Sequence, residues 1–173
     1  MNNTLAERED TSRIAATWFG AVPGLTDRLE AGARVADVGC WHGFAGILVA
    51  RAWPACDVLG FDRHEPSIAT ARARAAEAGD PPNVAFHQAG FEEIGGYGPF
   101  DVVLFVDSLH DLGDPGAAVR AAYRALTPGG VLVAVEPKRV CPERRLALLT
   151  EAGFTGASVA ADSGFTAVLT ATR

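Results

Sequence analysis

The sequence has few cysteines, and their spacing suits neither cross-linking nor metal binding. Only three of the 173 residues are cysteine, namely Cys40, Cys56 and Cys141, and no two of them form a CxxC pair. Such a set indicates neither a disulfide framework nor a zinc site. A chain of this length buries roughly 70% of the surface that its unfolded form exposes. We therefore expect a core that needs no cross-link.

Long apolar runs and an excess of positive charge are also lacking. The apolar runs are far shorter than the roughly 20 residues that span a bilayer. The first ten residues, MNNTLAERED, are polar and acidic, whereas a signal peptide is basic and then apolar. The formal net charge is -6, and nucleic-acid binding needs a basic surface. We expect a cytoplasmic protein with no nucleic-acid partner and no membrane contact.

The sequence does contain a regular alternation. Short β-branched runs alternate with Ala-rich stretches of helix length, which is typical of βα units and a mostly parallel sheet. Strands are predicted at 34–38, 57–62, 84–88, 101–106 and 131–136. Two later runs, 157–161 and 165–171, are separated by Asp-Ser-Gly, a spacing that predicts a C-terminal antiparallel hairpin.

The segments between the strands carry helix signals. We expect helices at 41–52, 65–78, 115–126 and 142–152, and a turn at 127–130. Asp114 followed by proline is typical of an N-cap, and Gly153 of a helix end.

Two parts are expected in the chain. Residues 33–173 make the α/β domain, and residues 1–32 form a helical segment that covers the sheet or a ligand. The apolar anchors of this segment are Trp18, Phe19, Val22 and Leu25.

A glycine-bearing turn follows the first strand. In the segment Asp37-Val38-Gly39-Cys40-Trp41-His42-Gly43, a buried strand enters a loop that opens a helix. Glycine allows a tight turn and a close approach of ligand to backbone, and the helix amides can meet a polar group. A plain structural turn is the alternative.

An acid ends the second strand. Asp62 follows Gly43 by 19 residues, and in this architecture its carboxylate can accept hydrogen bonds from both hydroxyls of a ribose. The alternative is an acid that is favourable beside the dipole of the next helix.

With these features in place, the chain from Arg34 onward resembles class I S-adenosylmethionine-dependent methyltransferases. ADVGCWHG is similar to their (D/E)xGxGxG loop, and FDRHEPSIATAR to the segment after their second strand. PFDVVLFVDSLHDLGDP, YRALTPGGVLVAVEP and LTEAGF resemble their later elements, in the same order. The resemblance implies a three-layer α/β/α Rossmann-like fold, with a mostly parallel seven-stranded sheet and a terminal antiparallel hairpin.

The resemblance also implies S-adenosylmethionine as cofactor. Its binding residues would be Asp37, Gly39, Cys40, Trp41, Gly43, Asp62, Arg63, Gly90, Phe91 and Asp107. Two positions depart from the family pattern. Trp41 stands where the loop usually has its middle glycine, and Gly90 stands where an acid usually meets the adenine amino group. That contact would then come from the backbone or from Glu92.

His110 and Asp107 are the catalytic candidates. A histidine near neutral pKa on a loop at the strand ends suits a general base that removes a proton from the methyl acceptor. The alternative is that His110 caps a turn or packs against a lid. Asp107, His110, Asp111 and Asp114 could also hold a metal, but Asp114 is better explained as a helix cap, so no metal is predicted.

The predicted function is methylation of a small molecule, with secondary metabolism as one setting. The chain has Asp107-Ser108-Leu109-His110 in place of the Asn/Asp-Pro-Pro-Tyr run that relatives acting on base amines or glutamine carry. Alternatives are a methyltransferase-fold enzyme with non-methyl or cyclisation chemistry, and a non-catalytic partner subunit. The short stretch before the final hairpin leaves a substrate cap to residues 1–32, to a second subunit or to no segment at all, so a homodimer stays open.

Overall fold

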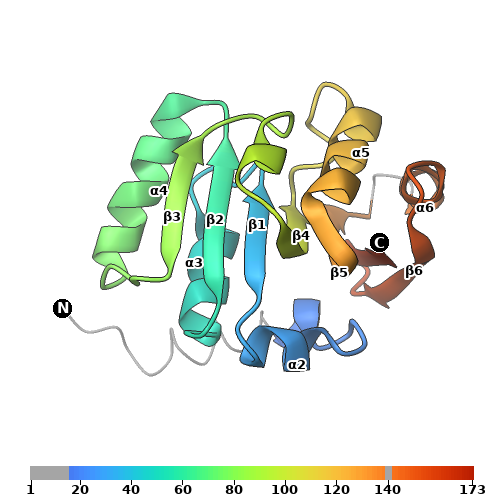
Figure 1. The fold of residues 1–173 in the computed structure, drawn as a ribbon, viewed down its shortest axis with the longest axis horizontal. Helices are drawn as coiled ribbons and strands as arrows, with labels where there is room; N and C mark the ends of the chain where they lie inside the picture. Colours follow the sequence, from blue (N-terminus) through green and yellow to red (C-terminus); the bar gives the residue numbers. More distant parts are fainter. Residues whose placement is uncertain (1–15, 139–141) are drawn as a thin grey trace.

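The computed structural model describes residues 16–138 and 142–173, and in these residues a seven-stranded sheet has helices on both faces (Figure 1). The strands lie in the order β3-β2-β1-β4-β5-β7-β6. Their bounds are β1 Arg34–Val38, β2 Asp57–Asp62, β3 Val84–Gln88, β4 Phe100–Val106, β5 Leu126–Pro137, β6 Thr155–Asp162 and β7 Thr166–Thr172. The first five pair in parallel, and β7 pairs antiparallel with both β5 and β6. The predicted parallel sheet and terminal hairpin are confirmed.

The helices follow the predicted signals closely. Their bounds are α2 Leu25–Glu30, α3 Phe44–Ala52, α4 Glu65–Glu77, the 3-10 helix η1 Ile94–Gly96, α5 Pro115–Ala125 and α6 Pro142–Glu151. The Asp114 carboxylate accepts a 2.8 Å hydrogen bond from the Ala117 amide, so its predicted capping of α5 is confirmed. Gly153 follows α6 with φ of 100°, as expected of a glycine that ends a helix.

Two predicted boundaries are wrong, for backbone reasons. Helix α3 begins at Phe44 and not at Trp41, because Trp41 and Gly43 have φ of 49° and 77°, outside the right-handed helical region. Residues 127–130, predicted as a separate turn, belong to β5, where the pairing with β4 shifts register. Leu126 pairs with Phe100, and Val131 already pairs with Val102.

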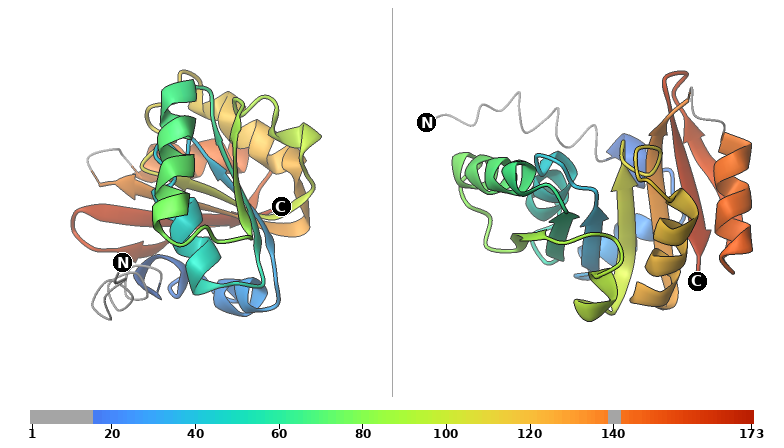
Figure 2. Two further views of the ribbon diagram at one scale, coloured as in Figure 1. Left: turned by 90° about the vertical axis from the view of Figure 1, so that its left-hand side faces the viewer. Right: turned by 90° about the horizontal axis from the view of Figure 1, so that it is seen from above.

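The core has a layer on each face of the sheet. On one face, α3 and the described part of the N-terminal segment bury Phe19, Val22, Leu25 and Leu29 against the strands. On the other face, α5 and α6 pack against the strands through side chains such as Val119 and Leu149, and Figure 2 shows this layering. Full burial of a leucine contributes roughly 1.5–3 kcal/mol. Within the described residues, no helix is both long enough and apolar enough to cross a membrane.

The parallel strands end together at one edge of the sheet. The arrowheads of β1, β2 and β3 point to the same side in Figure 1. In open α/β sheets, ligands bind outside the carboxyl ends of the strands. The loops after β1 to β5 at this edge are therefore where a site is expected.

Candidate functional site

Two hollows open at the carboxyl edge of the sheet. The first hollow has a volume of about 640 Å³ and is lined by the ends of β1 and β2 and by the loops after β3 and β4. The second hollow, of about 650 Å³, lies between the ends of β1, β4 and β5 and the start of α3. Three residues, Trp41, His42 and Asp111, line both. The two hollows therefore adjoin.

The β1–α3 turn lines both hollows, Gly39 the first, Cys40 the second and Trp41 both. The amides of Gly39 and Cys40 both donate to the Phe61 carbonyl, at 2.8 and 3.0 Å, which ties the turn to β2. Gly39 has φ of 69°, and a Cβ there would lie 2.8 Å from the Ser108 Cβ. Only glycine satisfies both the left-handed backbone and the close approach of the β4–α5 loop.

Gly43 has a different place in this turn. It lines neither hollow, and a Cβ there would lie 2.7 Å from the Phe86 ring and 2.8 Å from the Ala71 Cβ. With φ of 77°, it lets α3 start close against α4 and β3. The geometry of Gly43 therefore serves the close packing of α3 against α4 and β3.

The Asp62 carboxylate ties the β1 loop to the β2 loop. Oδ2 accepts a 3.1 Å hydrogen bond from the Trp41 amide, and Oδ1 accepts one of 2.9 Å from the His64 amide. Asp62 lines the first hollow. The carboxylate thus lies at the wall of that hollow, on the adjacent strand end where sequence reasoning expected it.

An ion pair lies beside Gly90. The Arg63 guanidinium is 3.0 Å from the Glu92 carboxylate, and both groups line the first hollow together with Phe91. A Cβ at Gly90 would lie 2.4 Å from the Glu92 Oε2 atom. The missing side chain of Gly90 therefore makes room for Glu92, the residue named above as an alternative partner.

Asp37 and Cys40 are buried groups on the second hollow. Burial raises the pKa of Asp37 to about 7; the hydrogen bond from the Gly46 amide opposes this, and the Asp62 charge adds to it. Burial also raises the pKa of the Cys40 thiol, with the charges of Asp37 and Asp62 acting in the same direction. Cys40 is a protonated thiol at neutral pH and unsuited to act as a nucleophile.

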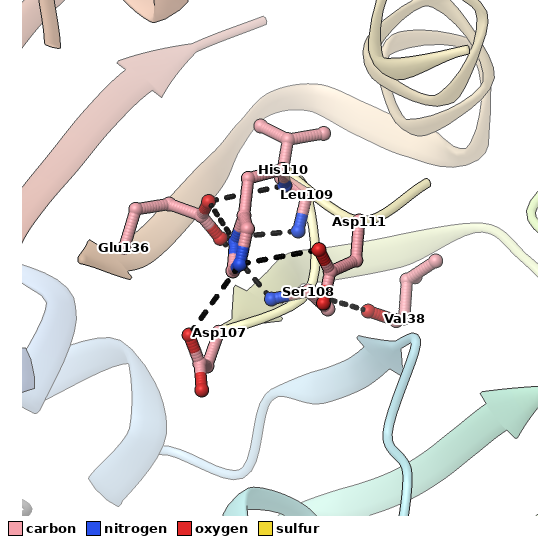
Figure 3. A network of polar contacts seen from close by, with 7 residues as sticks. All are labelled: Val38, Asp107, Ser108, Leu109, His110, Asp111 and Glu136. Atoms are coloured by element: carbon pink, nitrogen blue, oxygen red, sulfur yellow. Dashed lines mark hydrogen bonds and ion pairs between the residues drawn. The ribbon is translucent and has the colours of Figure 1, made fainter. Parts of the chain in front are cut away.

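The β4–α5 loop is organised around Glu136, at the carboxyl end of β5 (Figure 3). Glu136 is buried, and its Oε1 accepts from the amides of Ser108 and Leu109 at 3.2 and 3.0 Å. Its Oε2 accepts from the His110 amide at 3.1 Å and lies 2.9 Å from the His110 Nδ1. Sequence reasoning missed Glu136. The available signal was an acid ending the otherwise apolar strand VLVAVE at the edge where the site lies.

The two catalytic candidates lie side by side, but only one lines a hollow. Asp107 lines the second hollow, and its side chain is 73% exposed. The His110 ring is 10% exposed and lines neither hollow. Its Nε2 lies 3.9 Å from the Asp107 Oδ1 and 3.4 Å from the Asp111 Oδ1, so two carboxylates lie next to the ring. Among the described residues, no group of three or more His, Cys, Asp or Glu side chains could hold a metal ion.

Comparisons with a family profile and with curated proteins both find methyltransferases. The profile of a family described as a methyltransferase domain matches residues 29–163. The ubiquinone biosynthesis O-methyltransferase of Caulobacter sp. (strain K31) is 33% identical over 118 residues, which are 67% of this chain and 45% of that protein. The same-named protein of Pseudomonas aeruginosa (strain UCBPP-PA14) is 32% identical over 123 residues, 70% of this chain and 49% of that protein. The chain spans about half the length of these curated relatives.

Solved structures show the fold. A SAM-dependent methyltransferase from Aquifex aeolicus aligns with a TM-score of 0.75 and 17% identity, covering 95% of this chain and 97% of that one. The cyclase SpnF aligns with a TM-score of 0.74 and 22% identity, covering 95% and 80%. The predicted Rossmann-like arrangement is confirmed.

Proposed function

The chain belongs to the family of class I S-adenosylmethionine-dependent methyltransferases, and we propose that it methylates a hydroxyl oxygen of a small aromatic molecule. The observation that carries this proposal is the pair of adjoining hollows, one beside Asp62 and one beside Asp107. The printed names of the curated relatives support oxygen as the acceptor. That the substrate belongs to secondary metabolism stays a prediction.

The residues of the first hollow fit the adenosyl part of the cofactor. Asp62 would accept hydrogen bonds from the ribose hydroxyls, and Arg63, Gly90 and Phe91 would lie beside the adenine. A volume of about 640 Å³ is within the range of small-molecule sites. Asp37 and Cys40, on the second hollow, would lie near the methionine part. When bound, the cofactor supplies an electrophilic methyl group.

The second hollow fits an aromatic acceptor. Its lining includes the aromatic residues Trp18, Trp41 and Phe44 and the carboxylates of Asp107 and Asp111. Rings pack on one another in edge or offset geometry, as Trp18 and Phe44 already do with centroids 6.3 Å apart. One of the two carboxylates would accept the single hydrogen bond that a phenolic hydroxyl donates before its proton is removed.

The chain's part in the chemistry is to position the acceptor and to remove its proton. Because a carboxylate can only accept, the contact with Glu136 favours the tautomer of a neutral His110 ring that carries its proton on Nδ1, and in that tautomer Nε2 is the basic atom. The carboxylates of Asp107 and Asp111 are 73% and 61% exposed and line the second hollow, so proton transfer to Nε2 would require one of them to turn away and let the acceptor hydroxyl take its place. Catalytic hydrogen bonds often tighten only once the substrate is bound.

Two measurements test the proposal. Isothermal titration with S-adenosylmethionine and with S-adenosylhomocysteine should show micromolar to millimolar binding of both. Incubation of the chain with S-adenosylmethionine and catechol should yield equal amounts of S-adenosylhomocysteine and methylated catechol. Methylthioadenosine as the product would indicate non-methyl chemistry, and no binding of either ligand up to millimolar concentration would leave a non-catalytic partner role.

A further inference from the structure

Trp41 lies at the junction of the two hollows, in an unusual backbone conformation. It lines both hollows, and the residue is 53% exposed although its side chain is a large aromatic group. Its φ of 49° places it in the left-handed region, where a bulky residue is strained. Such outliers persist where the surroundings impose them, and they cluster at functional sites.

The surroundings that hold Trp41 are well defined. Its amide donates to the Asp62 carboxylate at 3.1 Å, and the preceding amides of Gly39 and Cys40 donate to the Phe61 carbonyl. The ring of His42 packs edge-on against the indole, with centroids 5.8 Å apart. The position of Trp41 is therefore a consequence of the loop and not of an apolar contact that would bury the indole.

In the proposed function, Trp41 lies where the positively charged sulfur of the cofactor would lie. The inference rests on that proposed function. The adenosyl part is assigned to the first hollow and the methionine part to the second. The positively charged sulfur joins these two parts, so the residues shared by the hollows flank it. Among the three shared residues, Trp41 supplies an aromatic face and Asp111 a carboxylate.

We propose that Trp41 is a specificity-determining residue that favours the positively charged cofactor over its neutral product. The face of an indole attracts a cation through the ring quadrupole, and tryptophan does so best among the aromatic side chains. S-adenosylmethionine carries the positive sulfur, whereas S-adenosylhomocysteine carries an uncharged thioether of nearly the same shape. The indole therefore strengthens binding of the cofactor without strengthening binding of the product, so the cofactor competes more effectively with the product for the same site.

A purely structural role predicts a different result. If the indole only filled space or restrained the loop, its removal would weaken both ligands by the same factor. The ratio of the two dissociation constants separates the two roles, because shape and loop effects cancel in it.

The test is isothermal titration of both ligands into the full chain and its variants. Trp41→Leu should lower the preference for S-adenosylmethionine over S-adenosylhomocysteine about three- to tenfold, a range between the exposed and desolvated limits for such contacts. Trp41→Phe, which keeps a weaker aromatic face, should lie between the wild type and Trp41→Leu. Phe165→Leu is the control: Phe165 is also an exposed aromatic residue, at 88%, but it lines neither hollow, so the ratio should not change.

Each outcome has one meaning. A loss of S-adenosylmethionine affinity with unchanged S-adenosylhomocysteine affinity supports the inference. An equal loss for both ligands, in variants whose circular dichroism matches the wild type, overturns it and leaves the proposed function intact. If the wild type itself binds neither ligand, the proposed function fails and the inference fails with it.

Discussion

The Nδ1 atom of His110 lies 2.9 Å from the Oε2 atom of Glu136, a buried carboxylate on the neighbouring strand. The same carboxylate also accepts hydrogen bonds from three successive backbone amides, those of Ser108, Leu109 and His110. One side chain therefore shapes the loop after β4 and orients the imidazole (Figure 3).

Glu136→Gln is expected to destabilise the fold and to slow catalysis. The glutamine amide nitrogen cannot accept a hydrogen bond, so one side of the group loses its partners in a buried site. Loss of hydrogen bonds to a buried charged group costs about 1.5–3 kcal/mol. Urea unfolding measures this cost. Glu77→Gln on the exposed side of α4 is the control and should change stability by less than about 0.5 kcal/mol. Equal effects of the two substitutions would remove Glu136 from this role.

His110→Ala is expected to reduce turnover by about 10²–10⁴-fold, the usual contribution of a general base. Binding of S-adenosylmethionine should change by less than about twofold, because His110 lines neither hollow. Steady-state rates with catechol and isothermal titration check the two parts separately. A change in turnover of less than threefold would show that the imidazole is not the base.

Asp62→Ala is expected to weaken S-adenosylmethionine and S-adenosylhomocysteine alike, by about 1–3 kcal/mol, because both carry the same ribose. The control is Asp57→Ala at the other end of β2. Asp57 is 59% exposed and pairs with Arg34 far from both hollows. Titration of both ligands measures the effect, and unchanged affinity in Asp62→Ala would refute the ribose role.

Gly43→Ala is expected to destabilise the chain more than Gly129→Ala. Both glycines have nearly the same φ, 77° and 76°, so both alanines carry the same backbone strain. At Gly43 the new Cβ would also lie 2.7 Å from the Phe86 ring, whereas nothing lies within 4 Å at Gly129. Overpacking of this kind costs about 1–3 kcal/mol. The difference in unfolding free energy between the two variants isolates it, and equal values would contradict the packing argument.

The wild type is expected to lose stability relative to Asp37→Asn as the pH rises from about 4 to about 7. Burial raises the pKa of Asp37 from 3.8 to about 7, so in this range the folded chain holds a proton that the unfolded chain releases. Stability therefore falls with rising pH. Asparagine carries no titrating proton. Urea unfolding of both proteins at pH 5, 6, 7 and 8 measures the difference, and a difference that does not vary with pH would contradict the prediction.

Much of the fold could be predicted because its signals are local. Asp114 caps α5 through an amide only three residues away, and the hairpin is marked by the Asp-Ser-Gly turn between its strands. The starts of α3 and β5 were predicted wrongly, because each depends on contacts between residues that are far apart in the sequence. The left-handed Trp41 depends on Asp62, 21 residues away, and the irregularity at 127–130 depends on how β5 pairs with β4.

In the candidate site, too, some features follow from the local sequence and others from contacts between distant residues. The sequence by itself determined which residues end the strands, because buried runs and turn residues mark those ends, and so it placed Asp37, Asp62 and Asp107 at one edge. Only the tertiary structure brought Glu136 to His110, through the pairing of Val106 with Val135, and only it set Trp41 between the two hollows. Strand register and the direction of a side chain depend on neighbours distant in the chain, and no local pattern records them.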